Sequence, residues 1–474
     1  MTRVTRRGLM KGMAAGAGLV VLSSSNSAWG YAANKKLNVA LIGVGGQAKA
    51  GHGMAEAENV VAICDADSSP DRLGLGANKW PDAKAYTDWR KVYDNHKDLN
   101  LVLVATPDHT HFPASYSAVV RGAGCYCEKP LTHSIWEART LAEATKKHKV
   151  PTQMGNQGHA GDGNRRVVEW VRAGVIGEIK EVHTWTNRAG SVWPQGKLGP
   201  FKEGKAPANV NWDAWLGVAP MRPYIVNDKG ESPVHPWKWR GWFDYGCGAI
   251  GDMGCHTWDS VWWSMDTRTP LSCEAIKVVE LGTETFPRQM IAKWEFGPSA
   301  PDSPFKRPAF TAYWYESGLK PEVPDEFLND PTRQDPNNPN KKPGLPGSGS
   351  IFIGTKGKIL VEGDYGDSPK LIPAARMEEF KSGEMKNIER IPRSIGHREE
   401  LLAACRGEQP WDYPKSNFTY AGPLVEAMNL ANVAVRLGAK VRWDTKTLKC
   451  PGTPNADVLI RRPYRKAFWD TTKA

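Results

Sequence analysis

A glycine-rich turn directly after a strand-like apolar run constrains the fold of this chain more than any other feature. The run 36–43 leads into Gly43-Val44-Gly45-Gly46-Gln47-Ala48, which fits the pattern G-x-G-x-x-A. A second apolar run, 59–64, delivers Asp65 about 20 residues further on, where an acid binds the ribose hydroxyls of a dinucleotide. Together these features predict a Rossmann unit, although the glycines alone would also suit an ordinary tight turn.

Acidic residues after the second run favour NAD over NADP as the dinucleotide. Asp65 and Asp67 would repel the 2′-phosphate that distinguishes NADP from NAD. Arg72 lies close behind and would attract that phosphate, because guanidinium groups bind phosphate well. The sequence therefore predicts NAD as the cofactor and leaves NADP as the less favoured alternative.

Strand-like and helix-like segments go on alternating after this unit. The apolar run 100–106 is followed by a helix-compatible run, 112–121, and by a short strand-like run, 125–127. The last run ends at Glu128-Lys129-Pro130. Doubly wound sheets bind their ligands at the carboxyl ends of parallel strands, so the Lys129 ammonium is expected beside the reactive end of the cofactor. The chain is therefore interpreted as a nicotinamide enzyme.

A second cluster of chemically useful side chains lies between Gly246 and Asp259. Asp252 and His256 are four residues apart, and on a helix this spacing places both side chains on one face. The carboxylate would then orient the imidazole and stabilise its protonated form. A structural aspartate–histidine pair that only braces a helix is the alternative.

Three motifs resemble those of the Gfo/Idh/MocA family, named for glucose–fructose oxidoreductase, inositol dehydrogenase and a rhizopine-catabolism protein. They are Gly43-Val-Gly45, Ala105-Thr-Pro-Asp-His-Thr-His111 and Cys127-Glu-Lys-Pro-Leu131. The resemblance implies an α/β protein with two domains. An N-terminal, doubly wound parallel Rossmann sheet would occupy 35–153, and a C-terminal α/β domain with a mostly antiparallel, open-faced sheet would occupy 155–450. The second domain would carry the substrate and form a homo-oligomer.

Two further expectations concern the second domain. Residues 301–350 are rich in Pro, Asn, Lys and Gly, which predicts a long surface loop. The segments His397–Cys405 and Pro423–Leu437 have apolar residues at helical spacing, and the resemblance places such helices near the domain interface.

The resemblance also implies roles for particular residues. Lys129, Asp252 and His256 match the lysine of an E-K-P motif and the acid and histidine of a D-x-G-x-H motif. His256 would act as the base, Asp252 would hold its ring, and Lys129 would polarise the substrate oxygen. The expected cofactor contacts are Gly43, Gly45, Gly46, Gln47, Asp65, Thr106, Pro107, His111, Glu128 and Lys129.

Tryptophans suggest where a carbohydrate would bind. Of 20 in the chain, ten fall between Trp185 and Trp263, and flat apolar rings suit the faces of sugars, although most are expected to be partly core. Polar residues at the domain junction are candidates for hydrogen bonds to the same ligand. The expected substrate contacts are Asn156, Gln157, Arg188, Trp193, His235, Trp237 and Trp242.

Charge and cysteine spacing argue against two other classes of protein. The formal net charge is +11, but the excess is spread along the chain without a block of like charges, which disfavours a nucleic-acid surface. No C-x-x-C spacing occurs, so a structural zinc site is not expected, and no other metal site is predicted.

The first residues have the pattern of an export signal. Thr5-Arg6-Arg7-Gly8-Leu9-Met10-Lys11 precedes an apolar stretch, 12–22, that is shorter than the roughly 20 residues needed to span a bilayer. This pattern predicts a twin-arginine signal in residues 1–33 and a periplasmic protein; an uncleaved signal would serve as a membrane anchor. Twin-arginine substrates cross the membrane folded, so the eight cysteines are expected to remain free thiols.

Export restricts the reaction cycle, because the periplasm holds no free NAD pool. The first hypothesis is an oxidoreductase that acts on a CH–OH group of a sugar or polyol with a tightly bound, internally recycled NAD. The alternative is a redox-neutral glycosidase or lyase that oxidises its sugar transiently; the Gly-Gly-His-Gly loop of one such group of relatives is absent. A non-catalytic NAD-binding sensor is the third hypothesis. The sugar and the oxidised carbon stay open.

Overall fold

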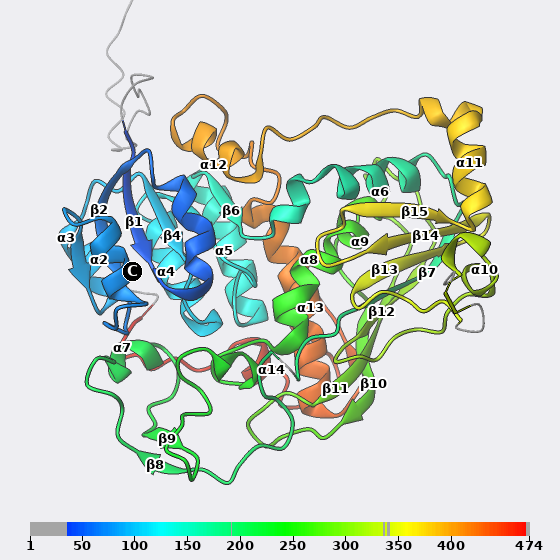
Figure 1. Ribbon diagram of the computed structural model, residues 1–474. Helices are drawn as coiled ribbons and strands as arrows, with labels where there is room; N and C mark the ends of the chain where they lie inside the picture. The colour runs from blue at the N-terminus through cyan, green and yellow to red at the C-terminus, as the bar shows by residue number, and fades with distance from the viewer. Residues whose placement is uncertain (1–35, 191, 335–336, 339–341, 471–474) are drawn as a thin grey trace, which may run out of the picture.

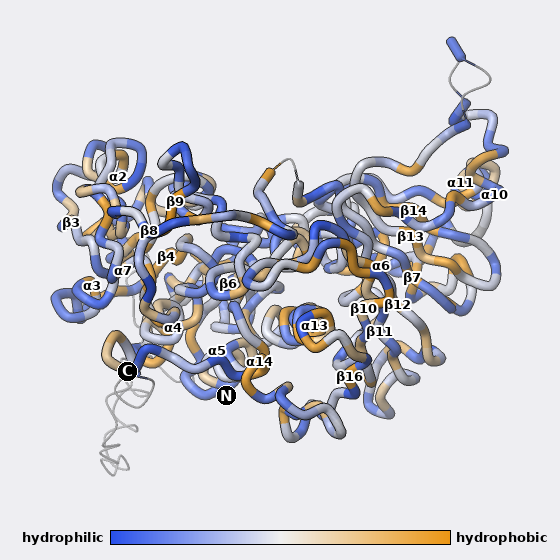
Figure 2. The backbone as a smooth tube through the Cα atoms, turned by 90° about the horizontal axis from the view of Figure 1, so that it is seen from below, coloured by the Kyte–Doolittle hydropathy of each residue, from blue (hydrophilic) through white to orange (hydrophobic). Residues whose placement is uncertain are grey.

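The computed structural model describes residues 36–190, 192–334, 337–338 and 342–470, so the predicted signal at 1–33 lies outside the described residues. Two α/β domains stand side by side in Figure 1. The long helix α13 (Phe418–Leu437) lies between them and is seen almost end-on in Figure 2. Within the described part of the chain, no helix is both long and apolar enough to cross a membrane.

The first domain is built on six parallel strands in the order β3-β2-β1-β4-β5-β6. This order is that of a doubly wound Rossmann sheet, which confirms the predicted fold. Helices cover both faces, so β4 and β5 are buried along their whole length, in keeping with their apolar sequences. The strands are β1 (Asn38–Ile42), β2 (Asn59–Cys64), β3 (Lys84–Tyr86), β4 (Leu101–Val104), β5 (Gly124–Cys127) and β6 (Thr152–Met154).

The helix after the glycine turn is a 3₁₀ helix, η1 (Gly46–Met54). Three of its nine residues are glycines, which disfavour a regular α-helix. A better-specified helix follows β5, where Ser134 and Glu137 form a capping box at the start of α5 (Ile135–His148). The other helices of this domain are α2 (Leu73–Lys79), α3 (Trp89–Asn95) and α4 (Asp108–Val119).

The second domain contains an eight-stranded sheet in the order β15-β14-β13-β7-β12-β11-β10-β16. All neighbours are antiparallel except β7 and β12, which confirms the predicted, mostly antiparallel sheet. Buried and half-buried residues alternate along β11, as one covered face requires. The strands are β7 (Ile179–Trp185), β10 (Ser272–Val279), β11 (Gln289–Phe296), β12 (Phe310–Tyr315), β13 (Gly349–Gly354), β14 (Gly357–Glu362), β15 (Ser368–Ile372) and β16 (Val441–Arg442).

The expectation of one long surface loop over 301–350 is wrong for its first part. Phe310–Tyr315 forms β12, which lies between β7 and β11 inside the sheet. Its aromatic residues have high strand propensity, and Phe310, Ala312 and Trp314 are buried. The prediction was wrong here because the residues around this short run are rich in Pro and Asn. In the described residues that follow this strand, Phe327 and Leu345 pack against Trp185, Tyr315 and Ile351 of the sheet.

Short and medium helices complete the structure, and one of them, 397–405, packs its Leu401 and Cys405 on the Rossmann sheet. His397–Cys405 is helical as predicted, whereas α13 begins at Phe418, before the predicted start at Pro423. The reason is Asn417, whose side-chain oxygen accepts hydrogen bonds from the backbone of Thr419 and Tyr420. The remaining helices are η2 (Gln157–Ala160), α6 (Asp162–Arg172), η4 (Ile250–Gly254), α8 (Cys255–Thr257), α9 (Asp259–Ser264), α10 (Asp325–Leu328), η5 (Pro331–Arg333), α11 (Ala374–Ser382), η6 (Glu384–Asn387), α12 (His397–Cys405) and α14 (Asp457–Ile460).

A tryptophan-rich segment, residues 192–245, leaves the second domain after β7. It contains β8 (Lys202–Gly204), α7 (Trp212–Leu216), β9 (Tyr224–Val226) and η3 (Lys238–Gly241). Its two short strands pair only with each other. Figure 1 shows its α7, β8 and β9 below the Rossmann domain, away from the eight-stranded sheet.

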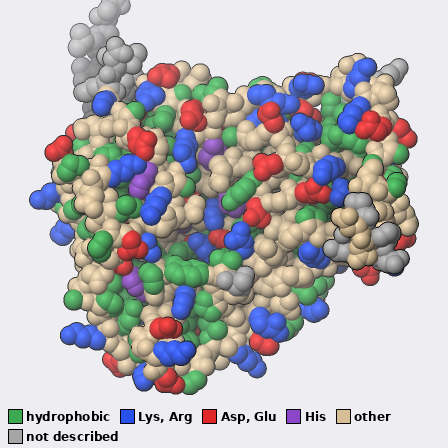
Figure 3. Space-filling model, in the orientation of Figure 1, with side chains coloured by type: hydrophobic (Ala, Val, Ile, Leu, Met, Phe, Trp, Pro, Cys, Tyr) green, Lys and Arg blue, Asp and Glu red, His purple; other side chains and the backbone are tan. Residues whose placement is uncertain are grey.

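Neither the charges on the surface of the described residues nor the cysteines indicate a second functional site. On the face shown in Figure 3, basic and acidic side chains are interspersed. All eight cysteines are buried and unpaired. Burial raises the pKa of thiols such as Cys125, to about 12, so they stay protonated and unreactive.

Candidate active site

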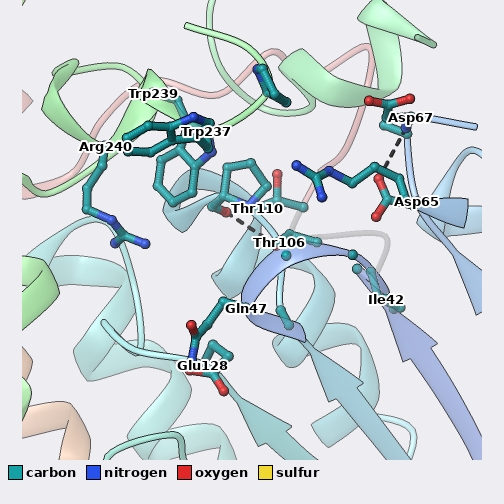
Figure 4. Close-up of a pocket in the computed structure, with 18 of the residues that line it drawn as sticks. Ile42, Gln47, Asp65, Asp67, Thr106, Thr110, Glu128, Trp237, Trp239 and Arg240 are labelled. Atoms are coloured by element: carbon teal, nitrogen blue, oxygen red, sulfur yellow. Dashed lines mark hydrogen bonds between the residues drawn. The ribbon is translucent and has the colours of Figure 1, made fainter. Parts of the chain in front are cut away.

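One cavity of about 380 Å³ joins the carboxyl ends of the Rossmann strands to the second domain. It extends from the glycine turn and Asp65 to Lys129, and on to Asp252 and His256. Figure 4 shows how Asp65, Gln47 and Glu128 from the Rossmann domain share this space with Trp237 and Arg240. A ligand in this cavity would therefore touch both domains.

The glycine turn brings the backbone close to the cavity. A Cβ atom at Gly43 would lie 2.3 Å from the oxygen of Ala105, and a Cβ at Gly45 would lie 2.5 Å from Cδ of Arg72. Only glycine fits at these positions, and the absence of side chains lets the diphosphate of a dinucleotide approach.

Asp65 follows β2 and faces the same part of the cavity. Its carboxylate accepts hydrogen bonds from the backbone N–H of Val44 at 3.2 Å and of Asp67 at 3.1 Å. Burial raises the pKa of Asp65 to about 6, so the carboxylate is mostly ionised at pH 7. It is placed to accept hydrogen bonds from ribose hydroxyls. Arg72 is paired with Asp71 at 3.3 Å.

The other predicted cofactor residues also line the cavity, with the exception of His111. His111 is buried behind the wall, where its Nδ1 lies 2.7 Å from the oxygen of Pro130 and its Nε2 lies 2.8 Å from the oxygen of Thr106. Burial lowers the pKa of His111, so the neutral ring can donate to only one of these oxygens at a time. Because α4 turns the ring inward, His111 positions the turn that carries Lys129 and does not face a ligand.

Lys129 and Asp252 form the central ion pair of the cavity. Nζ of Lys129 lies 2.5 Å from Oδ1 of Asp252, and Nε of Arg240 lies 3.4 Å from the same oxygen. Burial alone would raise the pKa of Asp252, but the two cations outweigh it and hold that pKa well below its usual range. Arg240 also pairs with the fully buried carboxylate of Asp108, at 3.2 Å. Asp252 is therefore a permanent anion.

His256 is near this pair, but the expected bond from Asp252 to its ring is not among the hydrogen bonds of the described residues. The carboxylate of Asp252 instead pairs with Lys129 and Arg240. The helix that contains Asp252 is a π-helix, η4. Burial, reinforced by Lys129, lowers the pKa of His256 to about 3, so the ring is neutral. Its Nδ1 is buried without a hydrogen-bond partner, and Tyr365 contacts the ring edge-on at 4.9 Å between centroids.

The predicted substrate residues divide into two groups. Gln157, Arg188, Trp193, His235 and Trp237 line the cavity. Arg188 donates to Asp364 at 3.2 Å. His235 lies on the cofactor side, where its Nε2 is 3.2 Å from Oδ2 of Asp67.

Asn156 and Trp242 do not reach the cavity, so their assignment as substrate contacts is wrong. Asn156 is fully buried, accepts a hydrogen bond from Ser416 at 2.6 Å, and donates one to the oxygen of Cys255 at 3.3 Å. It therefore holds the backbone beside His256. Trp242 is a core residue whose indole donates to the oxygen of Pro233 at 3.0 Å.

Sequence reasoning missed Arg240 and Tyr365. Arg240 packs over the ring of Trp239 at 4.5 Å, and no motif distinguishes it from the other arginines. Tyr365 comes from the loop between β14 and β15, far from His256 in sequence. Among the described residues, no group of three or more His, Cys, Asp or Glu side chains converges as a metal site would require.

Comparison with known proteins identifies the two domains. The model of an oxidoreductase family with an NAD-binding Rossmann fold matches residues 37–156. The model of the C-terminal α/β domain of the same oxidoreductase family matches residues 165–286. The glycine turn and Asp65 provide the cradle and the acid that NAD requires, so NAD fits the residues present.

Two curated relatives match part of the chain. Levoglucosan dehydrogenase of Pseudarthrobacter phenanthrenivorans is 24% identical over 205 residues, which cover 41% of this chain and 52% of that protein. The 2,7-anhydro-N-acetylneuraminate hydratase of Mediterraneibacter gnavus is 27% identical over 156 residues, which cover 32% of this chain and 40% of that protein. The chain thus spans about half or less of the length of these relatives.

A solved structure resembles most of the chain. The WlbA dehydrogenase of Chromobacterium violaceum, solved with NADH and UDP-GlcNAcA, has a TM-score of 0.57 at 15% identity and covers 88% of this chain and 98% of that one. At this identity the likeness shows the fold alone. The two family models together match half of the chain, so this protein belongs to the Gfo/Idh/MocA family of oxidoreductases with an NAD-binding Rossmann domain.

Proposed function

We propose that the protein is an NAD-dependent oxidoreductase that acts on a CH–OH group of a sugar or polyol. One observation carries this proposal: Lys129, Asp252 and His256 meet at one end of the cavity whose other end is formed by the glycine turn and Asp65. Substrate and nicotinamide would therefore meet beside an ammonium, a carboxylate and a neutral imidazole.

The proposed chemistry follows from these charges. Bound NAD would supply the hydride acceptor. When hydride leaves the carbon, the hydroxyl proton must leave as well, and the neutral ring of His256 would accept it. Lys129, held by Asp252, would donate a hydrogen bond to the substrate oxygen and stabilise it as a carbonyl forms. Asp252 balances the charge of Lys129 without itself taking up a proton.

Aromatic rings at the cavity support a sugar or polyol as substrate. Trp237 is 45% exposed and Tyr365 is 38% exposed although both line the cavity, and such partly exposed rings suit stacking on the apolar faces of sugars. The arginines on the wall are paired with carboxylates, Arg188 with Asp364 and Arg240 with Asp252, so a neutral ligand is favoured. The likeness to levoglucosan dehydrogenase agrees with this substrate class.

A redox-neutral reaction is the second candidate. In it, His256 would take up the hydroxyl proton while the sugar passes its hydride to bound NAD. The C–H beside the new carbonyl would then become acidic, elimination would follow, and the hydride would return to the sugar. The likeness to 2,7-anhydro-N-acetylneuraminate hydratase favours this candidate over a sensor, because a hydratase adds or removes water without net oxidation.

Export is a further part of the proposal. The residues 5–22 carry the twin-arginine pattern, so the protein would fold in the cytoplasm, bind NAD there and retain it in the periplasm. An uncleaved signal would tether it to the membrane. The cofactor would then be reoxidised in place by a second substrate. Residues on β10 that expose apolar surface, Ile276 and Val278, support association of copies through the open face of the sheet.

Two measurements test the proposal. Protein purified by gel filtration and then denatured should release one NAD per chain; absence of nucleotide would contradict the retained cofactor. Incubation with sugar mixtures and glycosides in deuterated water, followed by NMR, separates the reactions. A lactone or ketose together with an alditol indicates coupled redox, whereas deuterium beside the oxidised carbon with bond cleavage indicates elimination.

A matched pair of variants tests the role of the ion pair. Lys129→Ala should abolish turnover but keep NAD bound, because the glycine turn and Asp65 are unchanged. Lys180→Ala, which removes an exposed lysine paired with Glu178, should behave like the wild type. Full activity of Lys129→Ala would contradict the role of the ion pair in turnover.

A further inference from the structure

Several contacts from the tryptophan-rich segment 192–245 converge on one residue of the Rossmann domain, Asp67. Nδ2 of Asn209 donates to Oδ1 of Asp67 at 2.6 Å, and Nε2 of His235 lies 3.2 Å from Oδ2. Val210 forms an isolated β-bridge with Asp67, and the backbone N–H of Ser68 donates to the oxygen of Asn209 at 2.8 Å. Both carboxylate oxygens are thus held by the other domain.

This fastening point lies beside the adenosine half of the nucleotide cleft. Asp67 is two residues after Asp65, and both line the cavity. The opposite wall in this region comes from the tryptophan-rich segment, through Trp215, His235 and Trp237. In Figure 4, Trp237 stands across the space from Asp65 and Asp67, so the cleft is walled on the side away from the sheet.

The segment is a packed layer and not a loose loop. Its Trp215, Trp239 and Trp242 are buried together with Tyr245 in a small core of their own. Further attachments support it: Nε2 of His109 in α4 lies 2.8 Å from the oxygen of Trp215, and Arg240 pairs with Asp108 at 3.2 Å. A wall with its own core keeps its shape when the cofactor leaves.

The contacts at Asp67 are also well shielded. The side chains of Asp67 and His235 are each 8% exposed. Burial alone would raise the pKa of Asp67, but hydrogen bonds from Ser69 and Asn209 outweigh it and hold that pKa below its usual range. A buried carboxylate that is ionised and fully hydrogen-bonded binds its partners firmly.

We propose that the segment 192–245 is a cofactor clasp, which encloses the adenosine half of NAD and slows its release, with the contacts between Asn209, His235 and Asp67 as its fastening. The inference rests on the proposed function only in taking NAD as the ligand. A Rossmann cleft without a second wall lets adenosine leave along its open side. In this protein, release of NAD would require the contacts of Asn209 and His235 with Asp67 to break first.

The test compares two asparagines of the same segment. Asn209 does not line the cavity, so Asn209→Ala alters the fastening without removing a ligand contact. Asn227→Ala is the matched control, because Asn227 is half-buried and its side chain hydrogen-bonds to Lys229 and Glu231 of its own turn. Purified wild type and variants are loaded with NAD, and its release is followed after dilution.

The clasp predicts that Asn209→Ala releases NAD at least about tenfold faster than the wild type, and that Asn227→Ala releases it at the wild-type rate. Equal release from all three proteins would overturn the inference, and so would equal acceleration by both variants. Wild type that is purified without nucleotide would contradict only the proposal that NAD is retained during purification. The clasp would still be tested, because release is measured after the protein has been loaded with NAD.

Hydrogen–deuterium exchange of the wild type provides a measurement that does not depend on the variants. Bound NAD should slow exchange in 207–215 and 233–237, which fasten and wall the cleft. Exchange rates in these segments that do not change with NAD would contradict the clasp even if Asn209→Ala fails to fold.

Discussion

Glu316 provides a sharp test of how the wall of the active site is built. It is 1% exposed, and its carboxyl group accepts hydrogen bonds from Trp314 at 3.0 Å and from Gln195 at 3.3 Å, with no cation among its bonded partners. Gln195 in turn accepts a hydrogen bond from the indole of Trp193 on the cavity wall. Burial raises the pKa of Glu316 from its ordinary value of 4.5 to about 8.

The sign and size of the effect on stability follow from linkage. Between these two pKa values the folded protein keeps a proton on Glu316 that the unfolded chain has lost, so stability falls as pH rises. At about 1.36 kcal/mol per pKa unit, the free energy of unfolding should decrease by about 3 to 4 kcal/mol between pH 5 and pH 8 because of this group. Glu316→Gln cannot ionise and should lack this decrease.

Urea unfolding of wild type and Glu316→Gln at pH 5 and pH 8 measures the difference directly. All other groups titrate in both proteins, so subtracting one pH dependence from the other isolates Glu316. Glu322→Gln is the control, because Glu322 is exposed in the connection that follows β12 and its replacement should leave the pH dependence unchanged. Parallel pH dependences of wild type and Glu316→Gln would refute the reasoning.

Three further variants address the site itself. Arg240→Met leaves the buried carboxylate of Asp108 without its cation and should reduce the free energy of unfolding by about 3–5 kcal/mol, measured in urea against the exposed control Arg268→Met. Gly45→Ala places a Cβ 2.6 Å from a backbone oxygen and should weaken NAD binding about tenfold to a hundredfold by calorimetry. Tyr365→Ala should raise KM about threefold to tenfold through lost stacking, whereas NAD content stays the same.

Local patterns predicted most of the fold. The strand, glycine turn and Asp65 lie within one βα unit, so their sequence specifies the Rossmann domain directly. The run 310–315 was missed because a strand of six residues becomes stable only through its neighbours, and β7 and β11 come from distant parts of the chain. The start of α13 was missed because a single capping side chain, Asn417, decides it.

From the sequence, only those site residues that belong to recognisable motifs could be predicted. Lys129, Asp252 and His256 belong to short motifs, and the structure brings them to one cavity. The partners of Asp252 were not predictable, since Arg240 competes with His256 through a contact that only folding creates. Composition also failed to separate Trp237, which lines the cavity, from Trp242, which is core, because a count of rings does not show which way each one faces.

The distance between Lys129 and Asp252 depends on α13, because the two residues belong to different domains. Nδ2 of Asn432 in α13 donates to the oxygen of Cys247 at 3.1 Å, just before η4. Met428 packs so closely on η4 that a Cβ at Gly254 would lie 2.7 Å from its methyl carbon. The same helix packs along α5, which begins after the turn that carries Lys129. One rigid helix therefore sets the positions of both halves of the ion pair, which explains how a site assembled from two domains keeps a separation of 2.5 Å between its charged groups.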